Sequence, residues 1–325
     1  MRPVSVIIVS HGREAALKRC LKALRQLLYP TFEVVVVADR PTLAALQGLP
    51  QAMGIKTAPC DAQNISLARN IGLGLAAGEV VAFIDDDAVP EPTWLTHLAA
   101  VFDDAEVAAA GGYVRGRNGI SWQWRGAWVD GCGVRHALPL EGERPTVLHP
   151  GPGRAVKTEG TNMAFRREVI AGIGGFDPAF RFFLDETDLN LRLARAGLAT
   201  ALVPLAQVHH GFAASARRRA DRVPRDLFEI GASHAAFLLR HCPDAKRGGA
   251  QARFAGEQRR RLLRHMVAGR LEPRDVRHLL ARLEAGFAAG AARAPPVSSL
   301  RACSGRQQKI GKAMVNAARA PRIPP

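Results

Sequence analysis

The sequence predicts an α/β protein with a doubly wound sheet, followed by a smaller, basic α-helical unit. Three observations indicate this fold class. In the first 100 residues, short apolar runs of strand length alternate with stretches of helical periodicity. Carboxylates follow two of those runs, at Asp39 and at 85–87, and open α/β sheets bind ligands at the carboxyl ends of their strands. Beyond residue 215, the recognisable periodicity is helical.

The first two predicted strands and the helix between them form a βαβ unit. Residues 4–9 are nearly all apolar and β-branched, which is typical of a buried strand of a parallel sheet. The loop 10–13 follows, and then a helix with leucines on one face. Residues 33–38 predict the second strand, which ends at Asp39.

A second helix leads into the strand around which the chain is organised. Ser66 is its predicted N-cap and Gly78 its predicted C-terminal stop. Residues 80–84 are five consecutive apolar residues and predict a buried strand, from which three aspartates at 85–87 emerge. Pro92 then favours the first turn of a further helix.

Three adjacent carboxylates repel one another unless a cation or a hydrogen-bond donor neutralises them. Their oxygens suit Mg²⁺ or Mn²⁺, especially where the metal also binds phosphate groups. An acidic surface turn is the simpler interpretation of an isolated Asp-Asp-Asp. The apolar strand that leads directly into this one favours a metal-diphosphate site.

Residues 111–160 show little periodicity and contain Gly, Pro and three tryptophans, Trp122, Trp124 and Trp128. Two interpretations stay open: aromatic packing under a long loop, or a mobile flap over a bound substrate.

Further along, Asp185 and Glu186 open a predicted helix. Acids in a first turn suit the helix dipole, so capping alone is an alternative to a chemical role. Residues 200–208 contain two short strand candidates, followed directly by His209 and His210.

Charge divides the chain into unlike parts. Residues 1–215 hold 21 Lys/Arg and 21 Asp/Glu, whereas residues 216–325 hold 24 and 8 and so carry the whole net charge of +16. We therefore expect an α/β domain without net charge at 1–215, a basic helical region at 216–289 and a disordered tail at 290–325.

Composition also bounds the location. No stretch of eighteen apolar residues exists, and the N-terminus lacks the pattern of a signal peptide. The five cysteines are odd in number and far apart, so we expect neither a zinc site nor a disulfide framework. These features predict a cytoplasmic protein.

Together these features resemble the family 2 glycosyltransferases with the GT-A fold, over roughly residues 3–215. The resemblance rests on the order of several short motifs: Val4 to Ser10, Asp39, Ala68-Arg69-Asn70, Phe83 to Asp87, Gly160-Thr161-Asn162, Gly174 to Asp177, and Asp185-Glu186.

The resemblance implies inverting transfer of a sugar from a nucleotide-diphosphate donor, expected to be of the UDP type, to a glycan or lipid-linked acceptor. The residues that it implies for nucleotide binding are Ser10, His11, Glu14, Asp39, Arg69, Asp85 and Asp86. Those that it implies for Mn²⁺ or Mg²⁺ are Asp85, Asp87 and His209. His210 is the alternative ligand, and both histidines could instead be polar residues of a turn with no role in metal binding.

Inversion needs a base for the acceptor hydroxyl, and the family places it in a Glu-Asp pair before a helix. Here the pair is Asp185-Glu186, reversed in type. Position favours Glu186 and charge geometry could favour Asp185, so both stay candidates.

Alternatives remain for the whole chain and for its basic region. A nucleotidyltransferase would share the sheet and the acids, but the loop 10–13 is poor in the glycines and cations of a phosphate loop. A non-catalytic membrane-binding or nucleic-acid-binding protein would leave the ordered acids unexplained. The basic helices fit an anionic membrane surface or a helical cap on the catalytic domain, and nucleic acid is not the expected partner.

Overall fold

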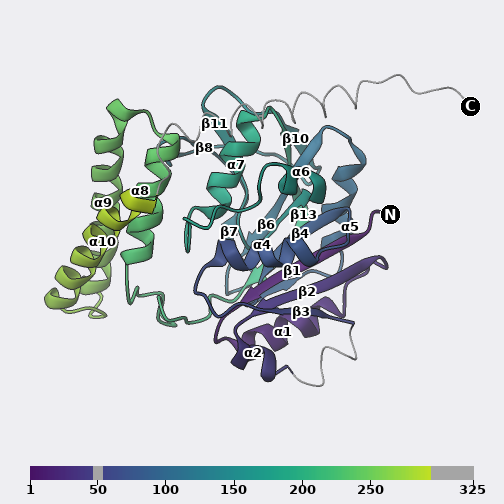
Figure 1. The fold of residues 1–325 in the computed structure, drawn as a ribbon, viewed down its shortest axis with the longest axis horizontal. Coiled ribbons are helices and arrows are strands. Elements are labelled where there is room, and N and C mark those ends of the chain that lie inside the picture. The colour runs from purple at the N-terminus through teal and green to yellow at the C-terminus, as the bar shows by residue number, and fades with distance from the viewer. Residues whose placement is uncertain (47–53, 294–325) are drawn as a thin grey trace, which may run out of the picture.

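The computed structural model describes residues 1–46 and 54–293, and a mixed sheet forms its centre (Figure 1). The strands are β1 Val4–Ser10, β2 Phe32–Ala38, β3 Lys56–Pro59, β4 Val80–Asp85, β5 Ala88–Pro90, β6 Val107–Arg115, β7 Trp122–Trp124, β8 Ala127–Asp130, β9 Arg135–His136, β10 Thr146–Leu148, β11 Arg154–Lys157, β12 Met163–Arg166 and β13 Ala199–His210. Ten of them form one sheet, ordered β10-β13-β6-β12-β4-β1-β2-β3, with β5 paired to β13 and β7 to β6. The order β11-β8-β9 makes a second, smaller sheet.

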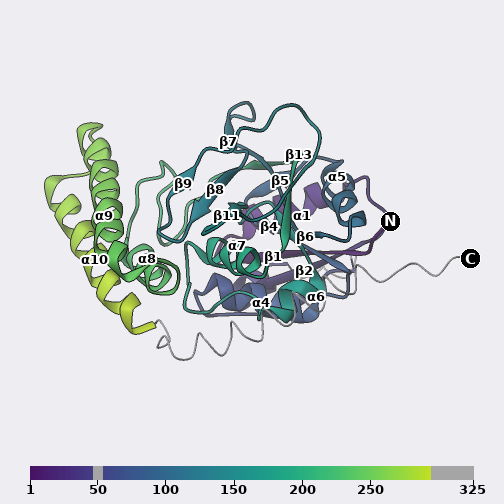
Figure 2. The same ribbon diagram turned by 90° about the horizontal axis from the view of Figure 1, so that it is seen from above.

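Helices cover both faces of the large sheet (Figure 2). The helices are α1 Glu14–Leu24, α2 Arg40–Ala44, α4 Ile65–Leu75, α5 Trp94–Ala100, α6 Arg167–Gly172, α7 Asp185–Arg195, α8 Phe228–His241, α9 Asp244–Val267 and α10 Pro273–Arg293, with a 3₁₀ turn at Val101–Asp103. Alternate residues of β1 divide between the layers: Val6 and Ile8 pack with α1 and α5, and Ile7 packs with α4, α6 and α7. The predicted doubly wound sheet is confirmed, with β12 running antiparallel to β4 and β6.

The segment 111–160, expected to be a long loop, contains several short strands. It supplies the end of β6 and then β7 to β11, each two to four residues long. Such short strands are stabilised by partners far along the chain, so they leave no periodic signal in the sequence. The tryptophans pack against basic side chains, with Arg115 4.2 Å from the Trp122 ring centre and Arg154 4.4 Å from that of Trp128.

Two local predictions need correction. The side chain that caps α4 is Asn64, which accepts a hydrogen bond from the backbone N–H of Leu67, whereas Ser66 donates its hydroxyl to the carbonyl of Phe180. The two strand candidates in 200–208 are one strand, β13, whose pairing with β6 is irregular between Val203 and Gln207.

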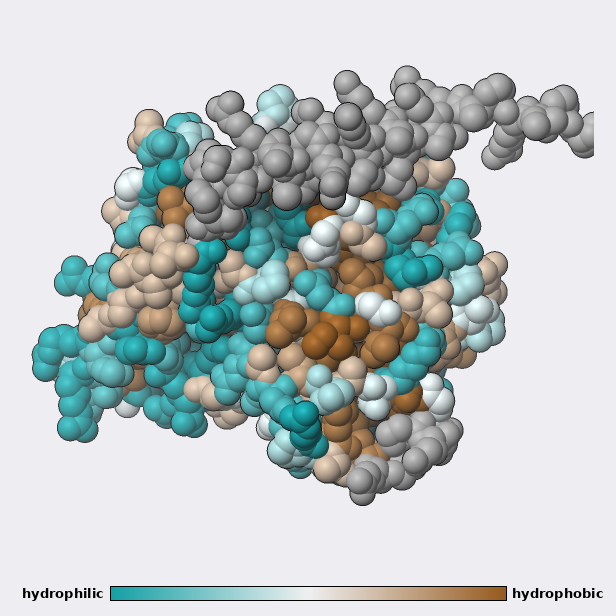
Figure 3. Space-filling model, in the orientation of Figure 1, coloured by the Kyte–Doolittle hydropathy of each residue, from teal (hydrophilic) through white to brown (hydrophobic). Residues whose placement is uncertain are grey.

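The C-terminal helices α8, α9 and α10 form a compact unit beside the sheet (Figure 1). Their apolar faces meet in one cluster of buried side chains, including Leu227, Leu262 and Leu283. Figure 3 shows a hydrophilic surface at the outer end of this unit, and an apolar area over α4 in the α/β part. The expected tail at 290–325 begins inside α10, which runs to Arg293, and residues 294–325 lie outside the described part of the chain.

Helices α8 and α10 approach closely because glycines lie at their contact. A Cβ atom on Gly290 would lie 2.1 Å from the carbonyl oxygen of Ala232, whereas one on Gly248 of α9 would meet nothing within 4 Å. We expect Gly290→Ala to lower the free energy of unfolding by about 1–3 kcal/mol, since the helices must separate.

Gly248→Ala is the matched control and should raise the free energy of unfolding by about 1 kcal/mol, the usual gain in helix propensity. Urea denaturation of both variants measures the two changes. Equal midpoints would show that the α8–α10 contact does not need glycine.

The expectation of no disulfide is wrong. Cys132, in the turn between β8 and β9, is bonded to Cys242 at the end of α8, with the two Cα atoms 4.7 Å apart. The partners are 110 residues apart in sequence, so cysteine spacing could not indicate their pairing. The bond ties the second sheet to the C-terminal unit. Within the described residues, every helix is too short or too polar to span a bilayer.

Candidate active site

The candidate metal site lies where β4 and β13 end. Asp85 closes β4, Asp87 follows in the turn to β5, and His210 closes β13. Pairing of β5 with β13 sets His210 opposite Ala88, directly beside Asp87. One ligand atom from each of Asp85, Asp87 and His210 lies within 4.8 Å of the others, so one cation could bridge them.

The donor atoms of this cluster suit a divalent cation. His210 Nδ1 lies 2.9 Å from the Gln123 side-chain oxygen, an arrangement in which Nδ1–H donates and Nε2 keeps its lone pair for a metal. His210 Nε2 is 3.2 Å from Asp87 Oδ1, which is a buried oxygen. Burial disfavours the imidazolium, but the hydrogen bond to Asp87 and the charge of Asp85 outweigh it and raise the pKa of His210. The same negative field favours a bound cation.

His209 does not join this cluster. Its Nε2 lies 2.6 Å from Glu91 Oε1, at a half-exposed position. Neighbouring residues of a strand point to opposite faces, so only one of the two histidines can face the acids. The position beside the carboxylates is that of His210, the alternative that the sequence left open.

Asp86 points into the protein and supports the turn. Ser10 donates its hydroxyl to Asp86 at 2.5 Å, and the Arg13 guanidinium lies 2.5 Å from the other oxygen. Burial raises the pKa of Asp86 to about 7, although Arg13 and Ser10 oppose the shift. For Asp87, burial alone would raise the pKa, but the hydrogen bond and charge of His210 hold it well below the usual range.

A cavity of about 290 Å³, here called the smaller cavity, opens beside the group formed by Asp85, Asp87 and His210. Ser10, His11, Asp85 and Asp87 are among the residues that line it, which places four of the predicted donor-side residues together. Glu14 begins α1 and is exposed, outside that lining.

Asp39 is bonded to the loop that follows β1 and is not among the residues that line the smaller cavity. It accepts hydrogen bonds from the Gly12 N–H at 2.9 Å and from the Thr42 hydroxyl at 2.6 Å. Burial alone would raise the pKa of Asp39, but these two bonds lower it, so the carboxylate is ionised.

Arg69 lies between Asp85 of the candidate metal site and the Asp185-Glu186 pair that begins α7. It is 4 % exposed, pairs with Asp185, donates to the carbonyl of Gly160 at 3.1 Å and lies 3.7 Å from Asp85. The predicted pair and the predicted metal ligands therefore share one arginine.

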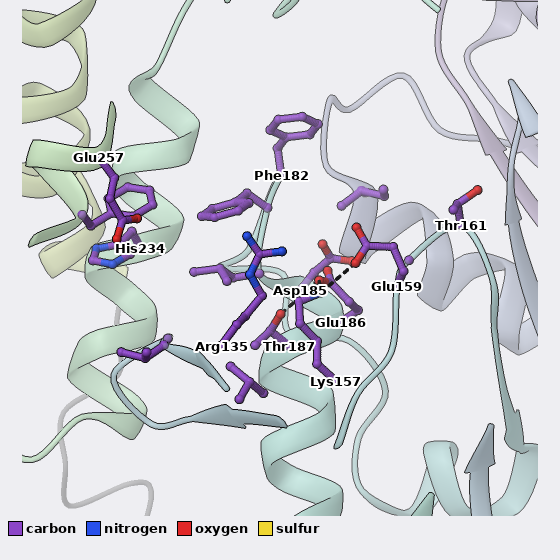
Figure 4. A pocket seen from close by; sticks show the side chains of 18 of the residues that line it. Arg135, Lys157, Glu159, Thr161, Phe182, Asp185, Glu186, Thr187, His234 and Glu257 are labelled. Atoms are coloured by element: carbon purple, nitrogen blue, oxygen red, sulfur yellow. Dashed lines mark hydrogen bonds and ion pairs between the residues drawn. The ribbon is translucent and has the colours of Figure 1, made fainter. Parts of the chain in front are cut away.

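The acidic pair lines a cavity of about 660 Å³, here called the larger cavity (Figure 4). Asp185 is tied to Arg69, and burial raises the pKa of Asp185 to about 7 against the charge of that arginine. Glu186 lies 2.9 Å from Lys157 Nζ. Burial alone would raise the pKa of Glu186, but the charge of Lys157 outweighs burial and lowers this pKa to about 2. Lys157 also pairs with Glu159 at 2.9 Å.

Three residues of the site were missed by sequence reasoning: Arg13, Lys157 and, as first choice of histidine, His210. Arg13 lies in the loop 10–13 that follows the first predicted strand, so its position was a usable signal. Lys157 lies in the segment expected to be irregular, and no local pattern marks it.

Comparison with known proteins gives a consistent result. The model of the family described as "Glycosyl transferase family 2" matches residues 5–174, just over half of the chain. The chain is 29% identical over 258 residues to "O-antigen biosynthesis protein RfbC" of Myxococcus xanthus, covering 72% of this chain and 19% of that protein. It is 28% identical to "Pre-mycofactocin glycosyltransferase" of Mycobacterium tuberculosis, covering 75% and 49%. With "Succinoglycan biosynthesis protein ExoM" of Rhizobium meliloti the identity is 38%, covering 54% and 55%.

These matches span about half or less of the relatives' own lengths. Among solved structures, the fold is similar to GalNAc-T7 with UDP, GalNAc and Mn²⁺ (TM-score 0.55, 17% identity, 74% of this chain and 48% of that chain). It is also similar to the mannosyltransferase PcManGT of Pyrobaculum calidifontis in complex with GDP-Man and Mn²⁺ (TM-score 0.52, 18% identity, 98% and 86%). At these identities the likeness concerns the fold, which is of the GT-A type.

Proposed function

The chain belongs to glycosyl transferase family 2, and on this premise we propose that it is a metal-dependent, inverting glycosyltransferase. It would move a sugar from a nucleotide-diphosphate donor to a hydroxyl group of an acceptor. The observation that supports this most directly is the position of the Asp85–Asp87–His210 cluster. Asp85 and His210 line both the smaller and the larger cavity, so the cluster stands between a donor side and an acceptor side.

On the donor side, the nucleoside would occupy the smaller cavity, with Asp39 accepting from the base and Ser10 and His11 nearby. The expected nucleotide is of the UDP type. Asp85, Asp87 and His210 would hold Mn²⁺ or Mg²⁺ against the diphosphate. The metal supplies positive charge that stabilises the negative charge developing on the departing diphosphate.

On the acceptor side, a carboxylate must accept the hydroxyl proton while the hydroxyl oxygen attacks the anomeric carbon. The bond from that carbon to the diphosphate breaks on the opposite face, which inverts the configuration. Asp185 and Glu186 lie where the larger cavity meets Arg69 and Asp85, so either is positioned next to the donor sugar.

We propose Glu186 as the base. A base must be ionised to accept the proton, and the charge of Lys157 favours the ionised form of Glu186 against its burial. Its side chain is 13% exposed, against 4% for Asp185, whose carboxylate is occupied by Arg69. Lys157 would hold Glu186 in place, and Asp185 would hold Arg69.

The pH dependence of the reaction separates the two carboxyl groups. A general base must be ionised, so the rate falls as the pH drops through its pKa. With Glu186 as the base, kcat/KM at saturating metal should stay flat from pH 8 down to about pH 5.5, well above its pKa of about 2. With Asp185 as the base, whose pKa is about 7, it should fall close to tenfold for each pH unit below 7.

We further propose a setting in which the chain builds a bacterial surface or extracellular glycan in the cytoplasm, at the inner face of the membrane. The relatives named for O-antigen and succinoglycan biosynthesis support the first part. Exposed arginines on α9, at 259 and 260, support contact with anionic lipid. The bond between Cys132 and Cys242 opposes the cytoplasmic part of this proposal, because disulfides are rare in a reducing cytosol. Thiol titration of freshly isolated protein tests it: free thiols at both positions support the cytoplasm, and a complete disulfide contradicts it.

Calorimetry tests the central proposal. The full chain is titrated with UDP, GDP and TDP, and with their sugars, in the presence of Mn²⁺, of Mg²⁺ or of a chelator. We expect binding of at least one nucleotide that strengthens with the metal. If no nucleotide binds with either metal, the glycosyltransferase proposal is wrong.

A further inference from the structure

The outer wall of the larger cavity is built from the C-terminal helices, beyond the residues that the family model matches. His234 of α8 and Arg253, Phe254 and Glu257 of α9 line it. The turn before β9 completes this wall and brings Arg135 into the cavity. The part of this wall that α8 and α9 supply lies outside the residues that the family model matches, and it faces the cavity in which an acceptor would bind.

The charges of the inner wall neutralise one another. Arg69 pairs with Asp185, and Lys157 pairs with Glu159 and Glu186. Each of these two cations therefore already has a carboxylate partner.

The outer wall is different. Arg135 makes no hydrogen bond or ion pair through its side chain with the described residues, and Arg253 donates only to the carbonyl of Cys132, at 3.0 Å. One carboxylate, Glu257, lines the same wall and has no partner within the described chain. The outer wall thus holds two cations and one anion.

Arg135 lines the same cavity as the acidic pair. In the view of Figure 4, its side chain reaches into the cavity between His234 and Asp185. A group bound by Arg135 would therefore share this cavity with the acceptor hydroxyl that Glu186 or Asp185 would deprotonate.

The aromatic side chains beside these arginines carry no charge. Phe182 and Phe183 line the same cavity, and Phe254 stacks on His234 with ring centres 3.8 Å apart. Burial lowers the pKa of His234 to about 3, so its ring is neutral. Arg135 and Arg253 are both exposed, so an anionic group can reach them from solvent.

The wall is also held rigidly, since Arg253 bonds to the backbone of Cys132 and Cys132 is bonded to Cys242 at the end of α8. Preorganised donors lose less entropy when a ligand binds.

We propose that Arg135 and Arg253 form an anion-binding subsite for the acceptor: the acceptor sugar carries a phosphate or carboxylate group close to its reacting hydroxyl. Planar guanidinium groups bind either anion through paired hydrogen bonds. This inference rests on the proposed glycosyltransferase function and narrows its acceptor class.

The test uses the full chain loaded with Mn²⁺ and the nucleoside diphosphate that binds it. Glucose 1-phosphate, glucuronate and methyl glucoside are titrated in at constant ionic strength, and their dissociation constants are measured by calorimetry. We expect one of the anionic sugars to bind at least about tenfold more tightly than the neutral glycoside. The preferred anion distinguishes a phosphorylated acceptor from a uronic acid.

Arg135→Met and Arg253→Met should each remove about a tenfold preference, with Arg135→Lys retaining part of it. Arg125→Met, on an exposed arginine outside the cavity, is the matched control and should change nothing. Equal binding of neutral and anionic sugars, no binding of any of the three, or an anion preference that survives in both Met variants would overturn the inference. If the wild-type chain does not take up metal and nucleotide at all, the function proposal itself fails, and that result is seen before any sugar is added.

Discussion

Replacing Asp87 by asparagine is expected to lower the affinity for Mn²⁺ by at least about 100-fold and to abolish metal-assisted binding of a nucleoside diphosphate. Partners that only orient a metal ligand already contribute about 10–100-fold to metal affinity, so a ligand itself should contribute at least as much. The asparagine side chain has the same shape and can still accept the backbone N–H of Ala213, which bonds Asp87 at 2.6 Å. The variant should therefore fold, and calorimetry with Mn²⁺ measures the loss.

The two neighbouring histidines provide the control for this prediction. His210→Ala should weaken Mn²⁺ binding, whereas His209→Ala should leave it unchanged, because His209 contacts Glu91 and not the acidic cluster. Equal effects of the two substitutions, or normal metal binding by the Asp87→Asn variant, would contradict the assignment of the site.

The second large effect is expected at the acidic pair. Glu186→Gln should reduce turnover by about 10²–10⁴-fold, the usual contribution of a general base, while the affinity for metal and nucleotide stays close to that of the wild type. Release of nucleoside diphosphate from the donor, with water or a small glycoside as acceptor, measures turnover. Calorimetric titration of the variant with metal and nucleotide shows whether it still binds the donor as the wild type does.

Asp185→Asn should behave differently. It removes the carboxylate that faces the buried Arg69 guanidinium, and breaking a buried pair in this way costs up to about 3–5 kcal/mol of stability. We expect a lower melting temperature, with turnover per folded molecule reduced less than in Glu186→Gln. Near-normal turnover in both variants would place the base elsewhere, and the reverse order would assign it to Asp185.

Several parts of the fold could be predicted because their signals are local. The apolar runs that become β1, β2 and β4 are buried on both faces, and such strands are continuous in sequence. The same holds for the aspartates after β4, which follow their strand directly. The helices of the C-terminal region were visible from the spacing of their apolar residues.

Other parts could not be predicted because they depend on contacts between distant segments. The strands β7 to β11 are too short to show alternation, and their partners lie elsewhere in the chain. Lys157 receives its role only when β11 is placed beside the start of α7. The bond from Cys132 to Cys242 likewise appears only when α8 packs against the turn between β8 and β9.

The sequence by itself determined the family, the sheet that carries the site and the acids at its edge. Each of these is indicated by a short motif of neighbouring residues, which can be recognised without the tertiary structure. Only the tertiary structure decided which histidine stands beside those acids, which cations hold the acidic pair and which helices line the larger cavity. The physical reason is that a strand turns successive side chains to opposite faces, so the choice between His209 and His210 depends on how β13 pairs with β5.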